Sequence, residues 1–415
     1  MNASRFLTFF LIELLLLLPA CMPAPQPGPA AVTPMPSTTA GQVTATPQSA
    51  TASAANGDRL QRGINLMGWF WLGPQDPAQI DTRFVDKDFA LLHELGFTFV
   101  RLPIDLGSVM DASRPDLLDP AKLAHLDRAL DMILAHDLAV IVDLHSISIQ
   151  ASDASNYSGD LDKDPKLQET FIRFWQSFAR HLSGRDPRLV YLELMNEPVF
   201  DGHTQDWLPL QKRLLDAARQ GAPELTLIAT SANWSNLDTF LQMTPVSDPN
   251  VIYNFHFYDP FLFTHQGATW TWDAVRPLRQ VPYPSNPQAV KAVIDSINDP
   301  AIKGYLQDYG NQRWDAAKIE QTLRQAADWG KRYHVRVICD EFGAYKQYSK
   351  PEDRQAWVHD VRTAFEKLGI GWSMWEYDSG FGLVERAGDF TQKPSIAVDI
   401  PLARALGLAE IQNNP

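Results

Sequence analysis

The sequence contains few cysteines and none of the short motifs that bind nucleotides or catalytic metals. Cys21 and Cys339 are its two cysteines, so we expect the fold to be stabilised by packing and not by disulfides. The phosphate-binding patterns G-x-G-x-x-G and G-x-x-x-x-G-K-[ST] do not occur, and neither H-E-x-x-H nor a paired C-x-x-C is present. We therefore expect no cofactor and no catalytic metal.

Positive charge is also scarce relative to negative charge. The formal net charge is −13 at pH 7, which argues against nucleic acid and against an anionic membrane surface as binding partners. An uncharged polymer is a better match for such a protein.

The first 21 residues have the features of a secretory signal peptide. They contain one positive charge, an apolar run over residues 6–18 and the small residue Ala20 before Cys21, as signal peptides do. The apolar run is shorter than the roughly 20 residues that span a bilayer. Leu-Pro-Ala-Cys resembles a bacterial lipobox, which would make Cys21 an acylated N-terminus. The alternative is an ordinary signal peptide that is cleaved nearby, with Cys21 unmodified.

Residues 22–57 carry no charged side chain and are rich in Pro, Ala, Thr, Ser and Gln. Such a segment cannot bury enough apolar surface to offset its ordering entropy, so we predict a disordered linker. We expect a secreted or extracytoplasmic protein, anchored as a lipoprotein at the bacterial cell surface. Any membrane contact would then be made only through the N-terminal lipid.

Residues 58–415 are predicted to form one catalytic domain of the α/β class. Eight short apolar or β-branched runs resemble buried strands. They cover residues 63–67, 97–104, 139–145, 190–197, 225–231, 251–258, 336–342 and 370–375. Amphipathic helical patterns lie between them, over residues 85–95, 121–136, 167–182, 205–219, 316–333 and 353–368. Eight such units predict a closed (β/α)8 TIM barrel, with residues 260–319 as an extended loop that leads into the next helix.

Two of the predicted strands end in a glutamate. Glu197 follows Asn196 at the end of the fourth strand, and Glu341 lies near the end of the seventh. Barrel enzymes place their chemistry at these strand ends, so the two carboxylates can face each other across the barrel mouth. Retaining glycosidases need two carboxyl groups roughly 5 Å apart. We therefore predict Glu341 as the nucleophile and Glu197 as the general acid/base.

Further polar and aromatic residues near the strand ends complete a pattern. In chain order the set is Arg101, His145, Asn196, Glu197, His256, Tyr258, Glu341 and Trp375. This set resembles glycoside hydrolase family 5, the cellulase family, over residues 62–406. Residues 261–267, Phe-Leu-Phe-Thr-His-Gln-Gly, resemble bacterial endoglucanases of that family.

The resemblance implies a supporting role for each matching residue. Asn196 would bind the sugar 2-hydroxyl, and Trp375 would offer a flat apolar face to the sugar. Tyr258 and Arg101 would donate to Glu341, while His145 and His256 would bind sugar hydroxyls or the acid/base region. An alternative for Arg101, which does not exclude this role, is a buried ion pair with Glu193 or Asp143.

Other residues are assigned to the core or to sugar stacking. We expect Asp143, Glu193 and Asp340 to satisfy buried polar partners, and Cys339, Trp175 and Trp357 to be core residues. Candidates for stacking on sugars lie in loops on the catalytic side. They are Trp69, Trp71, Trp207, Trp234, Trp270 and Trp272. The alternative is that about half of these tryptophans are ordinary packing residues.

The leading hypothesis is a monomeric retaining endo-β-1,4-glucanase that acts on β-linked polysaccharide. A β-mannanase, a xyloglucanase or an exo-β-1,3-glucanase would use the same catalytic residues, and loops that the sequence does not resolve would decide among them. A transglycosylase would differ only in whether a sugar or water reaches the intermediate. A sugar-binding lipoprotein without activity is a further alternative, which the presence of both glutamates disfavours.

Overall fold

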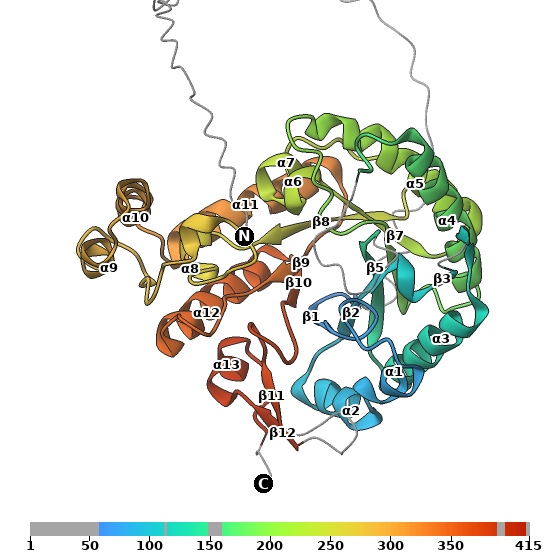
Figure 1. The fold of residues 1–415 in the computed structure, drawn as a ribbon, viewed down its shortest axis with the longest axis horizontal. Coiled ribbons are helices and arrows are strands. Elements are labelled where there is room, and N and C mark those ends of the chain that lie inside the picture. The colour runs from blue at the N-terminus through green and yellow to red at the C-terminus, as the bar shows by residue number, and fades with distance from the viewer. Residues whose placement is uncertain (1–57, 112–113, 148–159, 388–394, 412–415) are drawn as a thin grey trace, which may run out of the picture. The chain divides into compact units, whose positions relative to one another are not determined.

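Eight parallel strands close into a barrel in the computed structural model of the protein (Figure 1). The structure describes residues 58–111, 114–147, 160–387 and 395–411. The strand order is β1-β10-β9-β8-β7-β6-β5-β2, and pairing of β1 with β2 completes the ring. The predicted barrel is thereby confirmed. The predicted signal peptide, the lipidation of Cys21 and the linker over 22–57 lie outside the described residues.

Each barrel strand overlaps one of the predicted apolar runs. The strands are β1 (Arg62–Asn65), β2 (Phe99–Asp105), β5 (Ala139–Ser146), β6 (Val190–Glu193), β7 (Thr226–Thr230), β8 (Val251–Phe257), β9 (Val337–Phe342) and β10 (Gly371–Met374). The largest difference is at β6, which was predicted to reach Glu197. The strand ladder stops at Glu193, and beyond it the Asn196 N–H still donates to Leu144 O at 2.9 Å.

The six predicted helices are present and surround the barrel. They are α2 (Asp86–Leu95), α3 (Pro120–Ala135), α4 (Pro165–Leu182), α5 (Trp207–Gly221), α11 (Ala316–Tyr333) and α12 (Pro351–Leu368). At α3 and α4 an aspartate, Asp119 or Asp164, accepts from the first helical N–H groups, and a proline follows it directly. This order suits a helix start because proline lacks the N–H that would otherwise need a partner.

The same domain contains shorter helices and two small antiparallel sheets outside the barrel. They are α1 (Pro77–Arg83), α6 (Ala232–Ser235), α7 (Leu237–Phe240), α13 (Ile400–Ala405), η1 (Leu106–Ser108), η2 (Thr204–Asp206) and two hairpins, β3 (Met110–Asp111) with β4 (Arg114–Leu118) and β11 (Val384–Ala387) with β12 (Ser395–Val398). In the part of the chain that the structure describes, no helix is long and apolar enough to cross a membrane.

The interior of the barrel changes character within two residues along each strand. Toward the strand starts lies an apolar cluster, here called the lower layer, of Leu60, Phe99, Ala139, Ile141, Tyr191, Ile228, Ile252 and Ile338. Two positions further along five strands lies the upper layer, made of Arg101, Asp143, Glu193, Asn254 and Asp340, all fully buried. Because strand side chains alternate between faces, both sets point into the barrel.

The lower layer is filled tightly where β1 meets β2. Gly63 on β1 pairs with Phe99 on β2, and a Cβ at position 63 would lie 2.3 Å from the Phe99 ring. The missing side chain of the glycine therefore makes the room for the phenylalanine. Dense packing of this kind is typical of a barrel core and leaves no pore.

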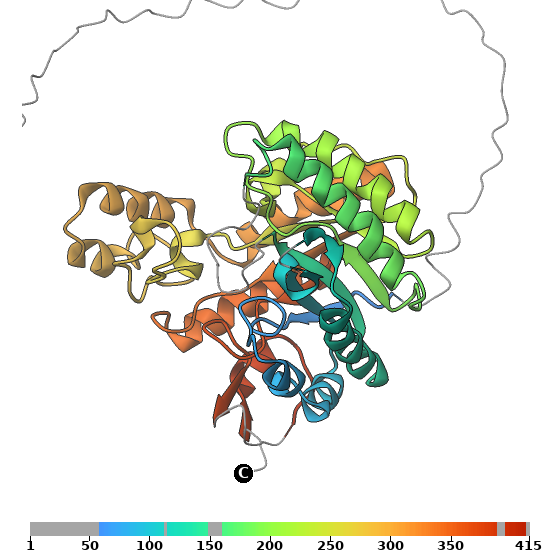
Figure 2. The same cartoon turned by 45° about the vertical axis from the view of Figure 1, so that its right-hand side comes forward.

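About half of the segment over residues 260–319, predicted as an extended loop, is helical, so that prediction was wrong there. It contains α8 (Phe261–Thr264), η3 (Asp273–Val275), α9 (Lys291–Ser296) and α10 (Pro300–Gln312). Asp299 caps α10 through Ala301 N and Ile302 N, and Ile302, Leu306 and Tyr309 are its buried face. The cap and this spacing are the helix signals that the loop prediction missed. Figures 1 and 2 show α9 and α10 standing outside the ring of barrel helices.

Candidate active site

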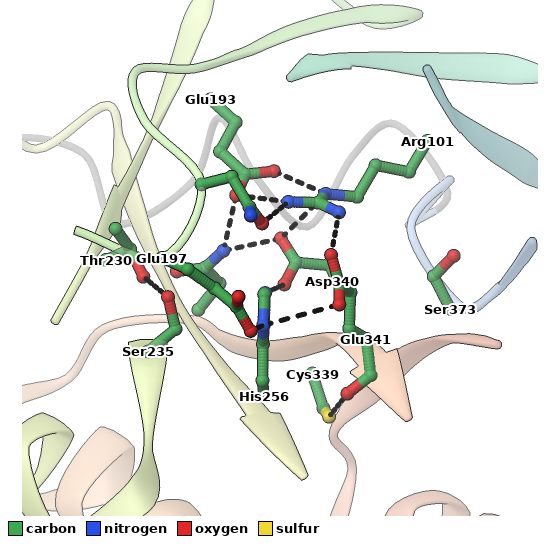
Figure 3. Close-up of polar contacts among 12 residues, drawn as sticks. Arg101, Glu193, Glu197, Thr230, Ser235, His256, Cys339, Asp340, Glu341 and Ser373 are labelled. Carbon is green, nitrogen blue, oxygen red and sulfur yellow. Dashed lines mark hydrogen bonds and ion pairs between the residues drawn. The ribbon is translucent and has the colours of Figure 1, made fainter. Parts of the chain in front are cut away.

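The two glutamates lie together at the carboxyl end of the barrel (Figure 3). Glu341 is the fifth residue of β9, and Glu197 follows β6 with a positive φ of 36°. One carboxylate oxygen of each lies within 4.8 Å of the other and of a His256 ring nitrogen. The left-handed backbone at Glu197 is strained for a residue with a side chain, and such strain is common at functional sites.

Arg101 connects the buried upper layer to Glu341. Its Nη1 donates to Glu341 Oε1 at 2.5 Å, and its Nε and Nη2 donate to the two oxygens of Glu193 at 2.7 and 2.8 Å. Nη2 also lies 3.0 Å from Asp143 Oδ2 and donates to Asn196 Oδ1 at 2.8 Å. The predicted donation to Glu341 and the alternative ion pairs with Glu193 and Asp143 are therefore both present.

Glu341 receives donors on both of its oxygens. Arg101 contacts Oε1, and the Tyr258 hydroxyl donates to Oε2 at 3.0 Å. Burial raises the pKa of the Glu341 carboxyl, and the positive charges of His256 and Arg101 act against this rise. Because donors and cations favour the ionised form, the site is built to hold a carboxylate where burial alone would favour a neutral acid.

His256 lies between three carboxylates. Its Nδ1 is 2.9 Å from Glu197 Oε1 and 3.5 Å from Glu341 Oε2, and its Nε2 is 3.3 Å from Asp340 Oδ1. Burial lowers the pKa of His256, but the surrounding carboxylates outweigh it and raise that pKa well above its ordinary value. His256 forms a hydrogen bond with Glu197 through Nδ1, while its Nε2 faces Asp340 as an ion pair.

His145 is the opposite case and is neutral. Burial and the nearby Arg101 and His256 hold its pKa well below the ordinary value. Its Nδ1 lies 2.7 Å from Asp143 Oδ2, and the Asn196 amide nitrogen lies 3.3 Å from its Nε2. The first nitrogen therefore donates to the carboxylate, and the second accepts from the Asn196 amide. Arg101 and His145 together orient Asn196.

The tryptophan predictions divide into three groups. Trp69 and Trp207 are core residues, so their assignment to sugar stacking was wrong. Their indole N–H groups donate to Ile80 O and Thr230 O at 2.8 and 2.9 Å, which fixes them inside the protein. Trp234, Trp270 and Trp272 are exposed, and Trp175 and Trp357 are fully buried core residues as predicted. Trp71 belongs to the third group, beside the catalytic residues.

Trp71 and Trp375 flank His145. The ring centroids of Trp71 and His145 are 4.0 Å apart, and Trp375 stacks on His145 at 5.4 Å with an interplanar angle of 17°. Both tryptophans share an apolar cluster with Phe381, against which Tyr258 and Tyr345 pack. Phe381 and Tyr345 were not predicted from the sequence. Phe381 follows β10 and Tyr345 follows β9, and these positions after barrel strands could have indicated that both residues lie near the site.

Glu376, directly after Trp375, was also missed. It is fully buried, and burial raises the pKa of its carboxyl to about 8. Aspartates of the upper layer and Cys339 behave as predicted: Asp340 accepts from the Asn254 amide at 2.6 Å, and Cys339 is buried. Burial raises the pKa of the Cys339 thiol, so this thiol is a poor nucleophile.

Two triads bring ligand atoms close enough to hold a metal ion. They are Glu193, His256 and Asp340, and Glu197, His256 and Glu341. In both, His256 already faces carboxylates through its nitrogens, and Arg101 contacts Glu193, Asp340 and Glu341. His256 and Arg101 thus place two positive charges among the four carboxylates of these triads.

Known proteins resemble this chain in both sequence and structure. The model of the family "Cellulase (glycosyl hydrolase family 5)" matches residues 55–380. The chain belongs to glycosyl hydrolase family 5. This confirms the resemblance and the barrel fold, and it makes the protein a glycoside hydrolase of a retaining family.

Relatives within the family carry endoglucanase names. The chain is 26% identical to Endoglucanase C of Acetivibrio thermocellus over 320 residues, which cover 77% of this chain and 91% of that protein. It is 27% identical to Endoglucanase 3 of Fibrobacter succinogenes, covering 79% of this chain but only 50% of that protein. The endoglucanase Cel5A structure from Thermotoga maritima superposes with a TM-score of 0.66 at 24% identity, covering 85% and 98% of the two chains. This family 5 protein therefore shares its fold with that enzyme.

Proposed function

We propose that the protein is an endo-acting β-1,4-glucanase that cleaves β-glucan polysaccharide by double displacement. The observation that supports it best is the pairing of Glu197 and Glu341, whose oxygens lie within 4.8 Å. This separation matches a retaining pair and is too short to leave room for the water of an inverting enzyme. The endoglucanase names of the relatives support the choice of glucan.

In the first step Glu341 acts as the nucleophile. Arg101 and Tyr258 donate to its two oxygens and keep it ionised. One oxygen forms a bond to the anomeric carbon while the glycosidic C–O bond breaks. Glu197 gives its proton to the departing oxygen, so that the released sugar leaves as a neutral alcohol.

In the second step the roles are reversed. Glu197, now ionised, takes a proton from a water molecule, and the water oxygen bonds to the anomeric carbon. The bond to Glu341 breaks and restores its carboxylate, so the configuration is retained. His256 donates to Oε1 of Glu197, which assigns the transferred proton to Oε2.

The sugar is held by polar and aromatic residues around this pair. Asn196, oriented by Arg101 and His145, is assigned to the 2-hydroxyl, and Trp375 to the apolar face of the same sugar. The exposed Trp270 is assigned to a neighbouring sugar, whereas Trp71 is buried and supports the site by packing against His145. These roles remain to be tested by substitution.

Trp234 is a further candidate, on the side of Glu197. Three successive residues, Asn233, Trp234 and Ser235, have φ between 52° and 57°, which is unusual for residues other than glycine. Asn233 N donates to Val199 O at 3.1 Å, so the turn is tied to the segment after Glu197. The strained turn holds Trp234 exposed, where it is available to a sugar beyond the cleaved bond.

Substrate and cleavage pattern are tested with purified protein on β-1,4-glucan, mixed-linkage glucan, xyloglucan, mannan and β-1,3-glucan. We expect β-1,4-glucans to be cleaved fastest, with intermediate oligosaccharides appearing before cellobiose and glucose. Fastest cleavage of mannan, xyloglucan or β-1,3-glucan would replace the proposed substrate by that polymer, and release of a single short product from the start would indicate exo cleavage. Transfer products that outnumber hydrolysis products would indicate a transglycosylase.

The carboxylate roles are tested separately. Glu341→Ala should abolish hydrolysis, and added azide should then give an α-glycosyl azide from an activated β-glycoside. Glu197→Gln should slow natural polymers far more than aryl glycosides with good leaving groups, because only the former need a proton on the departing oxygen. Equal loss on both substrates would contradict the acid/base assignment.

We also propose that the protein is exported and anchored through a lipid on Cys21, and that it acts as a monomer. The lipobox-like sequence before Cys21 supports the anchor. Mass spectrometry of the mature N-terminus and a Cys21→Ser variant test it. Release of the variant, but not of the wild type, from the membrane fraction is expected.

A further inference from the structure

Trp272 and Tyr305 form an exposed aromatic pair outside the barrel. Trp272 lies just before η3 and Tyr305 lies on α10, and their ring centroids are 4.9 Å apart. They keep 44% and 42% of their surface accessible. Aromatic residues of this size are normally well buried. Two of them side by side on the same segment therefore suggest a binding surface.

The surroundings of the pair are open and nearly neutral. Gly304 precedes Tyr305, and a Cβ placed there would meet nothing within 4 Å. Beside Trp272, Asp273 pairs with Arg276 at 3.0 Å, and Lys303 and Asp308 stand on either side of Tyr305 in α10, so both signs of charge are present in equal number. An uncharged ligand with apolar faces matches this chemistry better than a charged one.

A line of aromatic rings leads from the catalytic residues to Trp270, two residues before Trp272. Phe381 lies 6.2 Å from Tyr258, which contacts Glu341, and 6.4 Å from Trp270. Trp270 is exposed and packs edge-on against Tyr345 at 4.9 Å. Trp272 is two residues further on, at most about 7 Å along the chain between Cα atoms. The pair is therefore close along the chain to the outer end of this line.

The segment that carries the pair is fixed to the barrel. Trp357 on α12 donates its indole N–H to Asp259 O at 3.1 Å, and the Tyr283 hydroxyl donates to Asp360 at 2.7 Å. The Arg279 guanidinium lies 3.6 Å from the centre of the Tyr348 ring. These contacts hold the segment against α12 and the residues after β9, which is a fixed position relative to the barrel.

We propose that Trp272 and Tyr305 form a distal platform that binds an uncharged polysaccharide chain beyond the sugars at the catalytic residues. This inference rests on the proposed function, because it names an additional site for the same substrate. Stacked aromatic faces cover the apolar C–H faces of sugars. The platform favours long chains, since a short oligosaccharide bound at Glu341 does not extend to α10.

The test compares polymer and short substrate in a Trp272→Ala/Tyr305→Ala variant. We expect kcat/KM on soluble β-glucan to fall about tenfold, equivalent to about 1.4 kcal/mol, and kcat/KM on an aryl cellobioside to change less than twofold. The matched control is Tyr333→Ala. Tyr333 is also exposed, at 38%, and also packs against a tryptophan, Trp329, at 5.1 Å. It ends α11 at the start of β9, away from the barrel mouth, so neither activity should change.

Binding is measured independently of hydrolysis. In a Glu341→Ala background, native gels containing β-glucan, xyloglucan or mannan report retardation by each polymer. The platform is supported if the double substitution lowers retardation in a polymer that retards the parent. Equal retardation with and without the double substitution in every gel overturns it, whichever polymer the wild type hydrolyses.

The two proposals fail in different ways. A wild type that cleaves no β-1,4-glucan refutes the proposed function, while the gels still decide on the platform. A parent that no polymer retards refutes the platform. Analytical ultracentrifugation covers the other occupant, a second copy of the chain. If the wild type is a dimer and the double variant a monomer, the pair is a subunit interface and the platform proposal is wrong.

Discussion

The lower and upper layers of the barrel interior lie on the same strands and have opposite chemistry. Phe99 and Ile338 of the lower layer pack against other apolar side chains, whereas Arg101 and Asp340, two positions further along, are buried charges. Burying apolar surface stabilises a fold directly. Burying charges carries a desolvation cost that their mutual attraction only partly offsets.

Along a single strand, the lower layer therefore contributes to stability and the upper layer to the chemistry of the site. In the upper layer, each carboxylate contacts Arg101, His256 or an amide, and the chain of contacts ends at Glu197 and Glu341. Alternation along a strand places these groups with little freedom to move. The lower layer supplies the rigid base on which that geometry depends. Substitutions in the two layers should therefore have distinct signatures.

The largest effect is expected for Arg101→Met. It leaves Glu193 and Asp143 buried without their main cation and removes a donor from Glu341. We expect kcat/KM to fall by at least about a hundredfold and the free energy of unfolding to fall by about 3–5 kcal/mol. Arg336→Met is the control, because Arg336 pairs with Asp58 at the other end of the barrel. Full activity of the Arg101 variant would contradict the role of the upper layer.

In the lower layer, Ile338→Ala should affect stability alone. Ile338 is fully buried, and a truncation of this kind costs about 2–5 kcal/mol in the free energy of unfolding. We expect kcat/KM on an aryl cellobioside to remain within about twofold of wild type at a temperature where both are folded. Urea denaturation and steady-state kinetics measure the two quantities. A large loss of activity with little loss of stability would show that the layers are not separable.

A pair of tyrosines gives a smaller and more specific test by pH. Burial raises the pKa of Glu341, and the Tyr258 hydroxyl stabilises its charged form. Tyr258→Phe should raise that pKa further, so the acidic limb of the kcat/KM profile should move to higher pH. Tyr191→Phe removes a hydroxyl from the lower layer, where it donates to Arg188 O at 3.0 Å. Its acidic limb should stay in place.

The same pKa shift predicts a trend in stability. A carboxyl whose folded-state pKa exceeds its unfolded value binds more protons in the folded state, so stability falls as pH rises between the two values. Tyr258→Phe should make this fall steeper and extend it to higher pH than in wild type. Thermal unfolding from pH 4 to pH 8 measures it. An identical pH dependence in wild type and variant would argue against the hydroxyl as a stabiliser of the Glu341 charge.

The smallest effect is expected for Trp69→Phe. Trp69 lies near the mouth of the barrel but packs against Phe84 and Phe89 at 4.9 and 6.0 Å. We expect a loss of about 1 kcal/mol in the free energy of unfolding and no change in KM for β-glucan. A raised KM with unchanged stability would restore its assignment to sugar binding.

The strands were predictable because a parallel sheet covered on both faces needs continuous apolar runs. Strand ends then located Glu197, Glu341 and the residues around them. The buried aspartates were also predicted, since a charge within such a run must have a partner. The sequence pattern could not show that His256 contacts three carboxylates, because His256 lies on β8 whereas those acids come from β9 and from the segment after β6.

Two kinds of feature were not predicted from the sequence pattern: the burial of individual tryptophans and the helices within residues 260–319. Trp69, Trp71 and Trp207 follow strand ends just as Trp234 does, yet only Trp234 of these four is exposed, because the path of each loop decides which ring is buried. The segment over 260–319 hid its helices among prolines and aromatics, although Asp299 before Pro300 was a readable helix start. Local signals locate an element, whereas the packing of neighbouring loops decides which of its side chains remain available.

The tightly filled lower layer also determines how protons travel. Phe99 occupies the space beside Gly63 and the other lower-layer side chains are buried, so we expect the catalytic pair to exchange protons with solvent at the mouth. Glu197 has 18% of its side chain accessible there and Glu341 only 5%. A polysaccharide lying across the mouth closes this route, so the proton spent in the first step must already be on Glu197 when the chain binds. The water for the second step then arrives along the path vacated by the departing sugar.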